Sequence, residues 1–289
     1  MNSIAGKIGL VVEGGGMKCA YSAGILDRML DEGITFDYGI GVSAGSANLA
    51  SFMAGQRERN FRFYTVHPKE PDYFGAKSFL TTGNLFNLKY IYADLSNSDG
   101  ADPLDYPALV SNPAQFVVVA TNARTGRPTY FTKDDMHQDD YRIIMASSAL
   151  PAACRPIRIG SEDYYDGGVS DSIPVSRALL DGCDRVVVLL SKNRDFVKPP
   201  QDHRKTYTAM LQRYPAVIRA LNRRHLMYNR SMSYMFDLES RGKVFVMAPS
   251  EKMASNTYNM DIVRNRELYD LGIRDFNDRL DELKAFLRP

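Results

Sequence analysis

The sequence predicts an α/β fold in which helices cover both faces of a mainly parallel sheet, and three observations lead to this prediction. Apolar runs of strand length alternate along the chain with segments of helical periodicity. These runs are apolar at nearly every position, as expected of parallel strands that are buried on both faces. Glycine-rich turns follow two of the runs, where a strand would pass directly into a helix.

The expected strands are taken from the apolar runs. The segments "IGLVV" and "RVVVLL" consist almost entirely of β-branched and aliphatic residues, which favour buried strands. The run "PTYFT" is expected to extend the strand "QFVVVATN", and a short strand is expected to end at "DYYDGG". In chain order, the main expected strands span residues 7–14, 36–43, 115–122, 185–191 and 243–249.

The expected helices follow from apolar faces and from residues that begin or end a helix. Ala20, Ala23 and Leu26 share one face of the first helix. Pro151 stops the segment "DYRIIMASSAL", and "PVSRALLDG" has proline at its start and glycine after its end. In chain order, the expected helices span residues 18–31, 44–55, 57–64, 104–110, 140–150, 174–182 and 263–287.

Length and composition are those of an ordinary globular protein. The chain has 289 residues, of which 44% are hydrophobic and 24% charged, and it is long enough to bury a substantial core. We find no internal repeat, low-complexity tract or convincing linker, and we expect a single domain over residues 1–289. The net charge of +2 favours no nucleic-acid partner, and the pattern favours no particular oligomeric state.

The cysteines and the N-terminal sequence indicate a cytoplasmic protein. Cys19, Cys154 and Cys183 fit neither a disulfide framework nor a zinc site, so we expect a reducing compartment, no metal and no other cofactor. The apolar run that Glu13 closes is too short for a signal peptide. The uncharged stretch 38–56 contains glycines and polar residues, so a buried strand and helix explain it better than a membrane span.

The segment "GVSAG" points to catalysis by a nucleophilic serine. It has the pattern G-x-S-x-G at a strand-to-helix turn, where Ser43 would face a substrate. The N–H of Ala44, at the start of the following helix, would face negative charge that develops on a substrate oxygen. Because the motif is short, a plain glycine-rich turn capped by Ser43 is the structural alternative.

The glycines of "EGGGMKC" favour an anion site beside that serine. Neighbouring parallel strands end on the same side of a sheet, so the free N–H groups of Gly14, Gly15 and Gly16 would lie near the serine turn as an oxyanion hole. A dinucleotide fingerprint fits less well because Cys19 replaces its third glycine, and a P-loop requires a different spacing.

A third motif, "DGGVSDSIP", places Asp166 at the end of a short strand, although an ordinary Asp-Gly turn also explains it. Together with the block "ASSALPAACRPI", the three motifs resemble in order and spacing those of the patatin-like phospholipases, except that Cys19 stands where glycine is usual. The resemblance covers roughly residues 7–192. It implies a three-layer α/β/α fold for this catalytic core, followed by a helical and strand extension over about residues 193–289.

The resemblance also implies a function, the hydrolysis of acyl esters of lipids. It makes Ser43 the nucleophile and Asp166 its partner in a Ser-Asp dyad. The oxyanion segment that it implies consists of Gly14, Gly15 and Gly16. The expected mechanism passes through an acyl-enzyme, with the aspartate first accepting the serine proton and then activating water.

Other functions stay open on the residues alone. An α/β-hydrolase-type esterase with a Ser-Asp-His triad needs a histidine after the acid, and His203 and His225 satisfy that order. His67 and His137 precede the acid, and we expect surface or structural roles for all four histidines. A catalytically silent module that binds lipid or nucleotide could use the same glycines as an anion nest.

The segment 203–236 is basic and contains no acidic residue. Its apolar residues recur at helical spacing after Pro215. One explanation is a helix in peripheral contact with an anionic membrane surface. The other, which we favour, is a helix packed on the sheet with a solvated basic face, because arginine side chains reach solvent readily from any surface helix.

Overall fold

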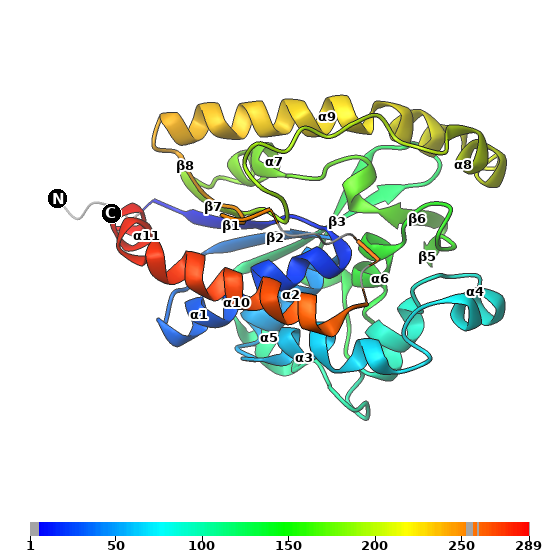
Figure 1. The fold of residues 1–289 in the computed structure, drawn as a ribbon, viewed down its shortest axis with the longest axis horizontal. Coiled ribbons are helices and arrows are strands. Elements are labelled where there is room, and N and C mark those ends of the chain that lie inside the picture. Colours follow the sequence, from blue (N-terminus) through cyan, green and yellow to red (C-terminus); the bar gives the residue numbers. More distant parts are fainter. Residues whose placement is uncertain (1–5, 253–256, 259, 289) are drawn as a thin grey trace.

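A mixed sheet runs through the centre of the molecule (Figure 1). The computed structural model describes residues 6–252, 257–258 and 260–288, and eight strands of this part of the chain form the sheet. In spatial order, its parallel strands are β3 (Gln115–Asn122), β2 (Tyr38–Val42), β1 (Ile8–Val12), β7 (Arg185–Leu189) and β8 (Val244–Met247). The antiparallel strands, all on the β3 side, are β4 (Pro128–Thr132), β6 (Glu162–Asp166) and β5 (Ile157–Ile159).

Helices cover both faces of the sheet, which confirms the expected three-layer α/β/α architecture (Figure 1). Alternate residues of β1 face the two sides: Leu10 and Val12 belong to one core, and Val11 to the other. The first core lies under α1 (Ala20–Asp31), α2 (Ala44–Met53), α3 (Arg59–Thr65), α5 (Tyr106–Ser111), α6 (Arg142–Ser148), α10 (Ile262–Asp278) and α11 (Leu280–Leu287). The second lies under α7 (Val175–Leu180) and α9 (Pro215–Ser240), while α4 (Ala76–Thr82) and α8 (Arg204–Met210) lie at the periphery.

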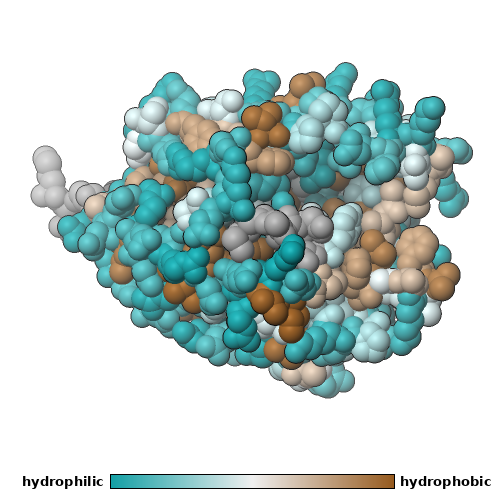
Figure 2. Space-filling view, in the orientation of Figure 1, coloured by the Kyte–Doolittle hydropathy of each residue, from teal (hydrophilic) through white to brown (hydrophobic). Residues whose placement is uncertain are grey.

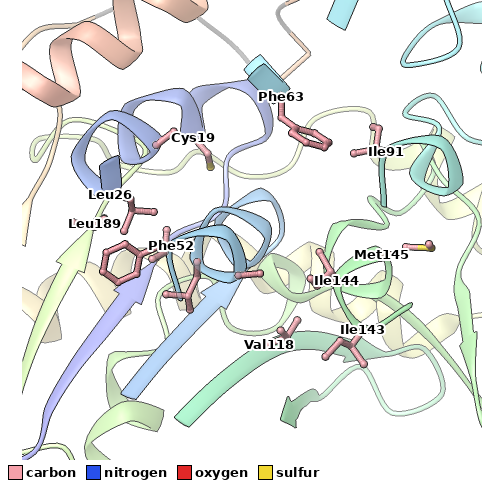
Figure 3. Packing of buried hydrophobic residues seen from close by; sticks show 14 of the residues in the cluster. Cys19, Leu26, Phe52, Phe63, Ile91, Val118, Ile143, Ile144, Met145 and Leu189 are labelled. Atoms are coloured by element: carbon pink, nitrogen blue, oxygen red, sulfur yellow. The ribbon is translucent and has the colours of Figure 1, made fainter. Parts of the chain in front are cut away.

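The uncharged stretch 38–56 lies in the interior of this architecture. All residues of β2 are buried, and α2 packs most of its side chains beneath the sheet. Figure 3 shows Cys19, Leu26 and Phe52 among the apolar side chains of this core. A buried strand and helix therefore account for the stretch. Elsewhere in the described ranges, no helix has both the length and the apolar character needed to cross a bilayer.

Two expected elements differ in the structure. The run "PTYFT" is a separate strand, β4, which runs antiparallel to β3 instead of extending it. The chain reverses there because Gly126 adopts a left-handed conformation, with φ 69°, and the carboxamide oxygen of Asn122 accepts the N–H groups of Arg124 and Thr125. The helix expected over residues 263–287 consists of α10 and α11, which meet at Arg279.

The C-terminal segment is joined to the rest of the chain by both a strand and a helix. β8 adds to the edge of β7 in parallel, and α10 packs along α1, where the Tyr21 hydroxyl donates to Asp275 over 2.9 Å. We therefore propose that residues 1–289 fold as a single domain, in which about residues 193–289 complete a catalytic core of about residues 7–192.

Candidate active site

Two strands that are distant in sequence meet end to end along one edge of β3. Val119 of β3 pairs with Val42, the last residue of β2, and the next residue, Ala120, pairs with Asp166, the last residue of β6. β4 occupies the other edge of β3 at these positions, so β2 and β6 share the same edge. Because β6 runs antiparallel to β3, the carboxyl ends of β2 and β6 point at each other, which brings Ser43 and Asp166 together.

The turn that carries Ser43 is strained and firmly anchored. Ser43 has φ 55° and ψ −134°, a conformation that costs a non-glycine residue about 1–3 kcal/mol and is typical of functional sites. Its N–H donates to Ser147 Oγ over 2.7 Å, and its carbonyl accepts both the N–H and the hydroxyl of Ser46. These bonds use the backbone of Ser43 and leave the hydroxyl free for chemistry, although the residue is only 8% exposed.

Asp166 is buried next to this hydroxyl. Its Oδ1 accepts the N–H of Gly168 over 2.7 Å, whereas Oδ2 has no hydrogen-bond partner of regular geometry within the described ranges. Burial raises the pKa of the Asp166 carboxyl, and this rise is opposed by the positive charge of Arg224 and by the hydroxyl of Ser43. Within the described residues, Oδ2 therefore stays available on a carboxyl group that lies next to the Ser43 hydroxyl.

The glycine segment after β1 lies directly against the serine turn. A Cβ atom added to Gly14 would lie 2.7 Å from the carbonyl oxygen of Val42 and 2.8 Å from the Cβ of Ser43, so only glycine permits this approach. Among the residues that the structure describes, none accepts a hydrogen bond from the N–H groups of Gly14, Gly15 or Gly16. The structure thus places Gly14 against the serine turn, where α2 begins with Ala44, and Gly14, Gly15 and Gly16 line the same cavity as Ser43.

A cavity of about 310 Å³ opens onto Ser43 and Asp166. One side, which we call the apolar wall, is formed by Phe63, Tyr73, Phe86, Leu88 and Ile91. The other side, which we call the basic wall, is formed by Lys192, Lys198 and Arg224. The apolar wall comes from α3 and the segment after it, and the basic wall comes from the loop after β7 and from α9, on the opposite side of the sheet in Figure 1.

Sequence reasoning did not identify Glu13, the buried carboxylate that lies next to the basic wall. Glu13, which is 2% exposed, accepts hydrogen bonds from Lys192 Nζ over 2.5 Å and from the Tyr228 hydroxyl over 2.9 Å. The N–H of Ser191 binds its second oxygen over 2.7 Å. A charged residue at the end of a buried strand was the available signal for Glu13, whereas Lys198, followed by two prolines, resembles an ordinary loop residue.

The histidines lie outside the cavity. His67 is held by Glu70 at Nδ1 and by Asp102 at Nε2, over 2.8 and 3.0 Å, in an ion-pair cluster near α3. His203 precedes α8, and His137 lies in an isolated bridge with Asp140. For the described part of the chain, no hydrogen bond joins any histidine, His225 included, to the serine or the aspartate discussed above. The arrangement can support a two-residue mechanism.

The outer face of α9 carries several of the basic residues of segment 203–236, whereas Arg224 faces the cavity. Val217, Leu221 and Tyr228 are buried against the sheet, while Arg223 and Arg230 are exposed. Figure 2 shows this side of the molecule as largely hydrophilic with some apolar residues among the hydrophilic ones, and Leu226 and Met227 of α9 are exposed. This is the pattern of a helix packed on the sheet with a solvated basic face. Contact of that face with a membrane surface stays a prediction.

Cys19 packs beneath the glycine segment. Its side chain is fully buried, with Sγ 3.5 Å from the carbonyl oxygen of Glu13. Burial, followed by the charge of Glu13, raises the pKa of the Cys19 thiol, so it remains protonated at neutral pH and offers no second nucleophile.

We expect Cys19→Gly to keep kcat within about threefold of the wild type, because Cys19 follows the free N–H groups and contributes packing alone. The measurement is kcat with a saturating ester, beside a thermal melt that records any loss of packing. A decrease of more than about tenfold, equivalent to about 1.4 kcal/mol in the barrier, would show that this position shapes the oxyanion segment directly.

Comparisons with known proteins find two family models, a curated relative and a solved structure that are similar to this chain. A family model described as patatin-like phospholipase matches residues 10–179, and a model described as a domain of unknown function, DUF6363, matches residues 214–288. The uncharacterized protein YjjU of Escherichia coli (strain K12) is 30% identical over 199 residues, which are 68% of this chain and 55% of YjjU. The match thus spans about half the length of that relative. The crystal structure of VipD from Legionella pneumophila aligns with 96% of this chain and 67% of its own, with a TM-score of 0.48 and 14% identity.

Proposed function

The chain belongs to the patatin-like phospholipase family, and we propose that it is a lipid acyl hydrolase in which Ser43 and Asp166 act as a catalytic dyad. The observation that supports this proposal is the end-to-end meeting of β2 and β6 on β3, because Ser43 directly follows the one strand and Asp166 ends the other. The cavity at that point supports an acyl ester as the substrate, because its apolar wall suits a hydrocarbon chain.

In the first half of the reaction, Asp166 Oδ2 accepts the proton of Ser43 while Oγ attacks the ester carbonyl carbon. The negative charge that develops on the carbonyl oxygen is stabilised by the free N–H groups of the glycine segment and of Ala44. The tetrahedral intermediate then expels the alcohol, which takes the proton from Asp166, and the acyl group stays on Ser43. In the second half, Asp166 removes a proton from water as the water oxygen attacks the acyl carbon. The bond between the acyl group and Ser43 Oγ then breaks, Asp166 returns the proton to Oγ, and the fatty acid is released.

An aspartate is ordinarily a weak base for a serine hydroxyl, because its pKa is about 4. Burial raises the pKa of Asp166 and so makes its ionised form a stronger base. The positive charge of Arg224 opposes that rise and helps to keep the carboxyl ionised. The two effects together support Asp166 as the general base, with oxyanion stabilisation worth about 3–4 kcal/mol for a single donor.

The proposal is tested with a panel of soluble p-nitrophenyl esters, lysophospholipids and phospholipids, together with labelling by a fluorophosphonate probe. We expect the wild type to hydrolyse acyl esters and to carry the label on the peptide that contains Ser43. A protein that binds lipid but neither turns over any ester nor takes up the label would be a silent binding module, and the proposal would be wrong.

A further inference from the structure

Three cations gather along one side of the cavity. Two of them are lysines that contact the ring of Tyr228. Lys192 Nζ lies 5.1 Å and Lys198 Nζ 5.3 Å from the centroid of that ring. Arg224 lies one helical turn before Tyr228 on α9, and its Nε donates to the carbonyl oxygen of Gly168 over 2.5 Å. Gly168 is the residue whose N–H binds Asp166, so Arg224 connects this group of cations to the proposed catalytic centre.

The position of Lys198 is fixed by its backbone. Its N–H donates to the Asn229 carboxamide oxygen over 2.8 Å, and its carbonyl accepts from the Asn229 amide over 3.1 Å. This pair of bonds ties the loop after β7 to α9 and holds Lys198 at the wall of the cavity.

The positive charge at this wall exceeds the negative charge that faces it. Glu13 is bound by Lys192, and Asp166 is the other carboxylate of the cavity. Across residues 6–252, 257–258 and 260–288, no carboxylate lies within ion-pair distance of Lys198. An ammonium group that is half-buried among other cations and has no carboxylate at ion-pair distance is costly unless an anion binds there.

The lowered pKa of Lys198 also indicates that its charged form is disfavoured at this wall. It is lowered to about 7, first by burial and then by the positive charges of Arg224 and Lys192. A bound anion would offset these effects and hold Lys198 in its charged form.

We propose that Lys192, Lys198 and Arg224 form an anion subsite that takes the phosphate of a lipid head group and selects acyl esters whose head group is net negative. The proposal rests on the proposed acyl hydrolase function and adds to it the class of head group. A phosphodiester fits because the subsite offers an ammonium and a guanidinium, the donors that bind phosphate oxygens best. A head group that also carries a cation, such as choline, would place that cation against uncompensated positive charge.

The test compares three soluble octanoyl esters below their micelle concentrations, so that binding to a lipid surface plays no part. Octanoyl lysophosphatidylglycerol and octanoyl lysophosphatidylcholine share the ester, the acyl chain and the phosphodiester, and differ in net charge. Mono-octanoylglycerol lacks the phosphate. We expect kcat/KM of the wild type to be at least about tenfold higher for the anionic than for the zwitterionic ester, mainly through KM.

Lys198→Met should reduce that ratio by about tenfold, and Lys198→Arg, which keeps the charge, should retain most of it. Lys205→Met is the matched control, because Lys205 is an exposed lysine on α8 that does not line the cavity, and it should keep the wild-type ratio. A wild type that hydrolyses both lysophospholipids equally well, or a ratio that Lys198→Met leaves unchanged, overturns the subsite while the hydrolase proposal stands.

A binding measurement separates failure of the subsite from failure of the hydrolase. Calorimetry with glycerophosphoglycerol, the head group without its acyl chain, needs no turnover. If the wild type hydrolyses no ester at all, the proposed function fails, and this titration still decides the subsite. Binding that Lys198→Met weakens by about tenfold supports it, and equal binding by both proteins overturns it.

The preference for the anionic over the zwitterionic ester should also depend on pH. The charged groups that face Lys198 are Arg224 on α9, Lys192 on its own loop, and Glu13 and Lys18 after β1. Because Lys198 loses its proton as pH rises, the anionic-to-zwitterionic ratio of kcat/KM should fall between about pH 6 and about pH 8. Effects on the dyad cancel in this ratio, since both esters use the same chemistry. A ratio that stays constant over this range contradicts Lys198 as the titrating cation.

Discussion

Ser43→Ala should abolish ester hydrolysis, leaving less than about 0.1% of wild-type kcat. The change removes the nucleophile and with it the acyl-enzyme, and neither water nor a neighbouring group replaces a positioned oxygen. The fold should survive, because the hydrogen bonds that anchor this turn come from the backbone of Ser43 to Ser147 and Ser46. We expect the melting temperature to change by no more than about 3 °C, in keeping with the loss of a single hydroxyl at a cost of a few tenths of a kcal/mol.

The measurement pairs kcat with fluorophosphonate labelling and a thermal melt. The control is Ser111→Ala at the exposed end of α5, which should hydrolyse and label like the wild type. Residual turnover above a few per cent in Ser43→Ala, or a label that persists on another residue, would reject Ser43 as the nucleophile. An inactive variant that also melts far below the wild type would indicate a structural role instead.

The part of this site that depends on local sequence could be predicted. Apolar runs identified the parallel strands, because a strand buried on both faces needs an apolar side chain at nearly every position. The roles of the glycines before Ser43 and after β1 could also be predicted, because a tight strand-to-helix turn and a close backbone approach both require glycine. These two signals alone place Ser43 beside Gly14.

The position of Asp166 could not be derived in the same way. It depends on β6 pairing antiparallel with β3 at Ala120, immediately beyond the end of β2. That register joins segments more than forty residues apart, from Ala120 to Asp166, and no local periodicity specifies it. The Asp-Gly pair alone is equally compatible with an ordinary turn, so the family resemblance was needed to select it.

The basic wall could not be predicted from the sequence, for a related reason. Helical spacing predicted that Tyr228 faces the interior, and the segment was recognised as basic, but spacing does not tell which of its arginines turns inward. Arg224 reaches Gly168 across 56 residues, and Lys198 is positioned by Asn229 across 31. The short strand β5 was missed because its residues are only partly buried or exposed and leave no apolar run.

Asp166→Asn should lower kcat by about a thousandfold, or about 4 kcal/mol in the barrier. Asparagine has nearly the same shape, and its carboxamide oxygen still accepts the N–H of Gly168, so the turn is preserved. An amide cannot accept the proton of Ser43, which leaves oxyanion stabilisation and substrate binding as the sources of residual activity.

In the wild type, kcat/KM should fall as pH is lowered, because Asp166 becomes protonated. Because burial raises the pKa of Asp166, this acid limb should lie above the usual 3.8 of an aspartate.

The same pKa shift predicts that Asp166→Asn is no less stable than the wild type, and this separates a catalytic role from a structural one. A carboxyl whose pKa is higher in the folded than in the unfolded protein binds more protons when folded. Its contribution to stability is therefore complete below the unfolded pKa and is lost as pH rises through the folded pKa. At neutral pH the charged Asp166 thus destabilises the fold, and the asparagine variant should melt at the same or a higher temperature.

The control is His225→Ala, which should keep both kcat and the acid limb, since no histidine of the described chain binds Ser43 or Asp166. A thousandfold loss in His225→Ala, or an acid limb that moves with it, would make the site a Ser-Asp-His triad and contradict the dyad.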